Sequence, residues 1–181
     1  MTNAADTSTN PGSTRLYPRT LPHADGEIAL RRMDAADAGA VLAFAQALPT
    51  HDLLFLPRDI TQPKVMDAWV RAIARGDIDS VLAVRDDKVL GCAAVIRDPH
   101  SWSRHVAELR VLVEPALRGS GLGRDILLAL MQAASERGDT EVLLHAQRSA
   151  EGFYRRLGFE GQGEPYEEAG IPHLTMRRAL G

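Results

Sequence analysis

A strand, a glycine-containing loop and a helix follow one another in the stretch Val111–Arg124, and this stretch constrains the fold most. Its sequence, V-L-V-E-P-A-L-R-G-S-G-L-G-R, begins with apolar residues, turns at Pro115 and carries three alternating glycines before an apolar helical segment. The first N–H groups of a helix have no partner within the helix, so a loop that leads into a helix favours a bound anion. The stretch therefore predicts a phosphate or pyrophosphate site.

Strands and helices alternate on both sides of this stretch. Residues 1–25, rich in Thr, Ser, Asn, Pro and Gly, are expected to form a disordered tail, and residues 26–181 a single domain. A first strand at residues 28–33 is followed by two helices, capped near Asp34 and started by Pro63, and by a hairpin that turns at residues 86–88. With the later elements, the order β-α-α-β-β-β-α-β-α-β-β predicts a layered α/β (α+β) domain.

Two familiar phosphate loops do not fit the glycine run. A nucleotide P-loop requires Gly-Lys-Ser/Thr, whereas Arg124 and Asp125 follow Gly123. A dinucleotide fingerprint requires a third glycine where Arg124 stands, and the chain has no second βαβ half. The phosphate ligand is therefore of another kind.

Two motifs resemble those of the GNAT superfamily of N-acetyltransferases. Arg118-x-x-Gly121-x-Gly123 resembles the acetyl-CoA signature Gln/Arg-x-x-Gly-x-Gly/Ala, and residues 150–159, A-E-G-F-Y-R-R-L-G-F, resemble the later motif A-x-x-F-Y-x-x-x-G-F. Both occur in the family's order, and the element order agrees over residues 27–180. The resemblance implies a GNAT-like mixed, mainly antiparallel sheet of about six to seven strands, flanked by helices on both faces.

The resemblance also implies a site for acetyl-CoA as co-substrate. The pyrophosphate would lie on the loop amides, where glycines permit close approach, and the pantetheine arm along residues 111–113, freed by a bulge near Leu112. Gln147 stands where the family often has Asn. The alternative for residues 111–113 is a plain core strand, and the alternative for the glycine run is a flexible turn. The expected cofactor residues are Val111, Leu112, Val113, Arg118, Gly119, Ser120, Gly121, Leu122, Gly123, Arg124, Gln147 and Tyr154.

Acetyl transfer to an amine needs a base for the amine proton and an acid for the departing sulfur. By resemblance, Tyr154 is the expected acid and the N–H near Val113 the oxyanion donor; a packed ring is the alternative for Tyr154. Glu108 is the expected base, and an ion pair with Arg104 or Arg110 is its alternative role. Three further side chains are candidates for the base: His105, His173 and His145, the last of which has the alternative of a core histidine.

The acceptor site is expected near the last hairpin. Tyr166, Glu167, Glu168 and His173 are its candidate residues, together with the apolar run at residues 53–56. Paired carboxylates there suit a cationic amine, and a solvated charged loop is the alternative.

The composition of the chain limits the kinds of partner that it can be expected to bind. A net charge of −3 favours neither nucleic acid nor an anionic membrane, and it weighs against an acetyltransferase that acts on aminoacyl-tRNA. The single Cys92 excludes an internal disulfide and a multi-cysteine zinc site, and no metal is expected. Without an apolar leader or spanning run, we expect a cytoplasmic protein, and a homodimer is compatible with these features. The expected activity is N-acetylation of a small-molecule or peptide amine; the alternative is a catalytically silent acyl-CoA-binding sensor domain.

Overall fold

The computed structural model describes residues 17–54, 56–98, 100, 102–103 and 105–181. Its centre is one eight-stranded sheet with the order β1-β2-β3-β4-β5-β6-β8-β7, in which only the β5–β6 pair is parallel. The strands are β1 (Arg19–Leu21), β2 (Ile28–Arg32), β3 (Ile78–Arg85), β4 (Lys88–Ile96), β5 (Val106–Val113), β6 (Glu141–Gln147), β7 (Glu160–Glu168) and β8 (Ile171–Ala179). The helices are α1 (Ala38–Ala47), α2 (Pro63–Arg75), α3 (Leu122–Glu136) and α4 (Glu151–Arg156).

The predicted mixed, mainly antiparallel sheet with helices on both faces is confirmed, but the strands number eight rather than six or seven. The additional strand is β1, which lies inside the stretch expected to be a tail. It is ordered because Tyr17 and Leu21 are buried against the core, and the Tyr17 hydroxyl donates to Glu136 at 2.9 Å. The rest of the expected tail, residues 1–16, lies outside the described residues.

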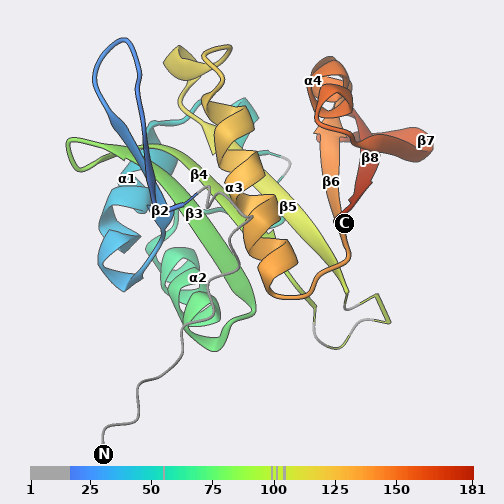
Figure 1. The fold of residues 1–181 in the computed structure, drawn as a ribbon, viewed down its shortest axis with the longest axis horizontal. Coiled ribbons are helices and arrows are strands. Elements are labelled where there is room, and N and C mark those ends of the chain that lie inside the picture. Colours follow the sequence, from blue (N-terminus) through green and yellow to red (C-terminus); the bar gives the residue numbers. More distant parts are fainter. Residues whose placement is uncertain (1–16, 55, 99, 101, 104) are drawn as a thin grey trace, which may run out of the picture.

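Helices cover the two faces of the sheet unequally. The long α3 lies across β3, β4 and β5 on one face, and α1 and α2 pack on the other (Figure 1). Side chains on β3 and β4 are buried almost throughout because both of their faces are covered, which explains their continuous apolar sequences. Among the described residues, every helix is too short or too polar to cross a bilayer.

A fork between β5 and β6 positions the site. These strands pair only at Val106–Glu141, Ala107–Val142 and Glu108–Leu143, and then they diverge (Figure 1). Beyond that point β6 continues in its pairing with β8. The second half of β5 therefore has a neighbouring strand on one side only.

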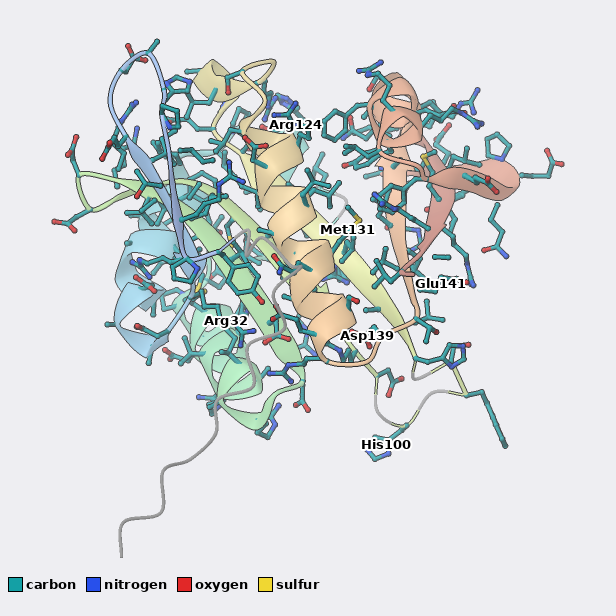
Figure 2. The ribbon with its side chains drawn as sticks, viewed as in Figure 1. Arg32, His100, Arg124, Met131, Asp139 and Glu141 are labelled. Atoms are coloured by element: carbon teal, nitrogen blue, oxygen red, sulfur yellow. The ribbon has the colours of Figure 1, made fainter. Side chains whose placement is uncertain are left out.

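The closed end of the fork is held by a buried ion-pair network. Arg97, directly after β4, contacts Asp139 at 2.5 Å and Asp79 at 3.0 Å, and all three side chains are at most 12% exposed. Asp139 precedes β6, so the network joins three segments that are distant in sequence. Figure 2 shows Asp139 near one end of α3 and Arg124 near the other, next to the glycine loop.

Candidate active site

The backbone of β5 directs unpaired polar groups into the fork. The His105 carbonyl accepts from Thr140 on the β6 side, and the Glu114 N–H donates to Leu90 on the β4 side. In an antiparallel ladder these directions alternate along the strand, so the N–H and C=O groups of Val111 and Val113 point away from β4 into the fork.

The bulge predicted near Leu112 is absent: β4 and β5 pair in unbroken register from Glu108 to Val113. Within the described residues, no strand pairs with the backbone groups of Val111 and Val113 on the side of the fork, because β6 turns away, so no bulge is needed. The Val113 carbonyl accepts from Arg118 Nη2. Leu112 itself pairs with Cys92, and its buried side chain packs on the α1–α2 face.

The loop between β5 and α3 has the features of an anion site. Gly119 and Gly121 have φ angles of 82° and 94°, the left-handed region that favours glycine. A Cβ atom at Gly119 would meet nothing within 4 Å, so packing does not require this glycine. Helix α3 begins after Gly121 without a side-chain cap, and the N–H groups of Gly123 and Arg124 have no acceptor within the described residues. They are available to a phosphate group.

Arginines line the cleft that includes this loop. Arg124 in the first turn of α3 and Arg156 at the end of α4 line the same cleft from its two sides. Arg118, expected to contact the cofactor, lines the cleft and forms an ion pair with the buried Asp52, and its Nη2 donates to the Val113 carbonyl at 3.5 Å. Arg118 therefore ties the segment between α1 and α2 to the glycine loop.

A cleft of about 570 Å³ joins the fork to the loop. Most of the expected residues line it: Glu108, Val111, Leu112, Val113, Arg118, Gly119, Gly121, Gly123, Arg124, Gln147 and Tyr154. Ser120 and Leu122 do not. The Ser120 hydroxyl donates to Leu117 O at 2.7 Å, and Leu122 is buried in the core under α3.

Some residues that line the cleft are not among those expected from the sequence. They include Asp52, Phe153 and Arg156. Arg156 had a sequence signal, because it lies two residues after Tyr154 within the second motif. Asp52 had none, since its partner is 66 residues away in the chain.

Tyr154 lies where α4 meets the fork. Its ring packs in T-shaped geometry against Phe153 and Phe159, with centroid distances of 5.0 Å and 5.9 Å. Burial raises the pKa of its phenol above the ordinary value of 10.0. The group therefore stays protonated at neutral pH, as a proton donor must.

Two possible bases face the α2 side of the fork. Glu108 accepts from Arg110 Nε at 2.9 Å, so the ion pair considered as its alternative role is present. Arg104, the other partner considered, lies outside the described residues. His145 is exposed rather than a core residue, and its Nδ1 lies 2.5 Å from the Tyr166 hydroxyl. His105 lies at the closed end of the fork.

The residues expected to border the acceptor are only partly gathered. Burial raises the pKa of the Tyr166 phenol, and the negative charges of Glu168 and Glu108 raise it further. A hydrogen bond with Thr175 acts in the opposite direction and lowers it. The Tyr166 ring stacks on that of His173, which is fully buried. Glu167 and Glu168 are exposed at the end of β7 and line neither the cleft nor a second cavity beneath α2.

Other candidates have clear places. Of the apolar run, Leu56 lines the cleft, Leu53 packs on the core, Leu54 is 52% exposed and Phe55 lies outside the described residues. Cys92 is buried, which raises the pKa of its thiol to about 12 and leaves it unreactive. Within the described residues, no group of three or more His, Cys, Asp and Glu is arranged to hold a metal ion.

Comparisons with known proteins agree with this geometry. The family model described as an acetyltransferase (GNAT) domain matches residues 57–180. ElaA of Escherichia coli K12 is 32% identical over 106 residues, which cover 58% of this chain and 69% of ElaA. The uncharacterized YyaT of Bacillus subtilis 168 is 36% identical over 77 residues, which cover 42% of this chain and 52%, about half, of YyaT.

Solved structures share the fold over most of the chain. A ribosomal-protein-alanine N-acetyltransferase from Brucella melitensis superposes with a TM-score of 0.69 at 26% identity, over 83% of this chain and 99% of that chain. YncA from Salmonella typhimurium, solved with acetyl-CoA, superposes with a TM-score of 0.71 at 22% identity, over 85% of this chain and 94% of that chain. At that identity the second likeness concerns the fold alone.

Proposed function

This chain belongs to the GNAT acetyltransferase family, and on that premise we propose that it transfers an acetyl group from acetyl-CoA to a primary amine of a small molecule or peptide. The observation that carries the proposal is a single cleft. It joins the backbone of Val111 and Val113, which has no strand partner on the side of the fork, the uncapped start of α3 and the buried phenol of Tyr154.

The cleft fits acetyl-CoA at both ends. The N–H groups of Gly123 and Arg124, with the guanidinium groups of Arg124 and Arg156, suit a pyrophosphate. The backbone of Val111 and Val113 suits a peptide-like arm, which forms strand-like hydrogen bonds. When bound, acetyl-CoA supplies the acetyl group as an activated thioester.

The side chains then divide the proton transfers. One N–C bond forms and one C–S bond breaks, so the amine loses a proton and the sulfur gains one. Glu108 accepts the proton from the amine, the Val113 N–H stabilises the carbonyl oxygen, and Tyr154 donates its proton to the sulfur. His145, oriented by Tyr166, is the second candidate for the base.

Paired substitutions identify the base. Glu108→Gln keeps the size of the side chain and removes its basicity, so we expect kcat to fall about 10²-fold, the lower end of the range for general bases, since Arg110 holds the carboxylate. His145→Gln should cost less than about tenfold. Steady-state kinetics of CoA release measure both. The reverse order of the two effects would assign the base to His145.

The activity itself is tested with the purified protein. Mass spectrometry of the native protein should detect bound CoA or acetyl-CoA, and acetyl-CoA should release thiol when a panel of primary amines is added. Binding of CoA without thiol release from any amine would favour a silent acyl-CoA sensor. Failure to bind CoA would overturn both functions.

A further inference from the structure

A second cavity, of about 690 Å³, lies on the α2 face of the sheet. It shares Leu56, Arg110 and Leu112 with the cleft at the fork, so the two spaces meet at β5. A molecule in this cavity therefore lies against the α2 face of β5, the strand that also borders the cleft. That is where a second substrate must lie if both are to react together.

The cavity has an apolar interior. Its floor holds small residues of β4, Cys92 and Ala94, which leave room beneath α2. Trp69 forms part of the wall, and its Nε1 donates to Ser80 Oγ at 3.0 Å, which fixes the indole ring. The space suits a ligand with an apolar body.

The charges around the cavity are mostly positive. Among the described residues, one carboxylate lines it, that of Asp77, and it is paired with Arg75 at 2.8 Å. In the part of the chain that the structure describes, five arginines line it: Arg58, Arg71, Arg75, Arg97 and Arg110.

Two of these arginines remain uncompensated. Arg97 is neutralised by Asp79 and Asp139, and Arg110 by Glu108. Arg58, ahead of α2, and Arg71, on α2, form no ion pair within the described residues. Such guanidinium groups repel a second cation and bind carboxylates or phosphates with paired hydrogen bonds.

We propose that this cavity binds the acceptor as an amine that also carries an anionic group and an apolar body, with Arg58 and Arg71 contacting the anion. The assignment rests on the proposed acetyl transfer. An amino acid with an apolar side chain has all three features. This acceptor differs from the cationic amine expected from Glu167 and Glu168, neither of which lines the cavity.

Matched acceptors test the charge. Phenylalanine, phenylalaninamide and the aminophosphonate analogue of phenylalanine share one apolar body and one primary amine. We expect kcat/KM to be at least about tenfold higher for an anionic member than for the amide, as for hydrogen bonds to charged groups. The less basic amine of the amide favours the opposite order, so amine basicity cannot produce this result. Equal rates, or faster transfer to the amide, would overturn the proposal.

Matched variants test the residues. Arg58→Gln and Arg71→Gln should each raise KM for the anionic acceptor about tenfold and change KM for the amide much less. Arg75→Gln is the control, because it lines the same cavity but is already paired with Asp77. If all three variants behave alike, Arg58 and Arg71 do not bind the anion.

A binding measurement separates this proposal from the catalytic one. Trp102 is fully exposed, so Trp102→Phe leaves Trp69 as the single fluorescent reporter in the cavity wall. In that background, 3-phenylpropionate should change the fluorescence more strongly than its amide, and Arg71→Gln should abolish the difference. Equal binding of acid and amide would overturn the anion site. Selective binding of the acid without acetyl transfer to any amine would overturn the proposed function and, with it, the acceptor role.

Discussion

Replacing Tyr154 with phenylalanine is expected to lower kcat about 10³-fold, with little change in KM for acetyl-CoA. The substitution removes only the hydroxyl group. The ring contacts with Phe153 and Phe159 remain, so the fold and the shape of the cleft are kept. A loss confined to kcat therefore reports the missing proton donor.

The pH dependence provides a second signature of the same group. Because burial raises the pKa of the Tyr154 phenol above 10.0, its acid form persists through neutral and mildly alkaline pH. It is lost only as the pH rises through that raised pKa. Loss of the Tyr154 proton should therefore not lower the wild-type kcat below about pH 10. An alkaline decline in kcat that Tyr154→Phe removes should begin only above that pH.

A distant phenol supplies the control. Tyr17 lies before β1, and its hydroxyl donates to Glu136 at the far end of α3 from the loop. Tyr17→Phe should leave kcat unchanged. If Tyr154→Phe also leaves kcat unchanged, Tyr154 packs the helix against the sheet and does not take part in the reaction.

Replacing Arg97 with methionine is expected to lower the free energy of unfolding by about 3–5 kcal/mol, a large share of the total for a single domain. Methionine retains the apolar stem of the side chain but leaves Asp139, 5% exposed, without its cation. Asp79 keeps Arg137 at 2.8 Å, so the main penalty falls on Asp139. Denaturation by urea measures the change.

Arg75→Met is the matched comparison. Arg75 also bonds a neighbouring aspartate, Asp77, at 2.8 Å, but its side chain is 62% exposed. An exposed pair contributes about 0–1 kcal/mol, so the two arginines should differ severalfold in their effect on stability. Similar losses for both would contradict the special role of the buried network.

Local signals in the sequence predicted the helices and most strands. Gly76 ends α2 as expected, and the two aspartates with positive φ, Asp86 and Asp87, form the predicted hairpin turn. The glycine loop and Tyr154, predicted to share a cofactor site, line one cleft. These features depend on residues within a few positions of one another, so periodicity and motifs suffice.

The remaining features depend on partners distant in the chain. Strand β1 is ordered because Tyr17 and Leu21 are buried. The surrounding sequence is polar and does not indicate this burial. The Arg118–Asp52 pair joins residues that no local pattern connects. Likewise, the sequence of Val111–Val113 does not indicate whether a bulge or the departure of a neighbouring strand frees its backbone.

The fork gives the sheet a third edge, in addition to those at β1 and β7. An ordinary sheet edge is a hazard, because its unpaired N–H and C=O groups can recruit a strand from another molecule and start aggregation. Here the groups of Val111 and Val113 that lack a strand partner lie between two strands of the same sheet, and β6 lies beside the gap. A foreign β-strand with its own neighbours cannot enter that gap, whereas a single thin, extended molecule can. The recessed position thus hinders this strand from pairing with a strand of another molecule, while its pairing capacity stays open to a small ligand.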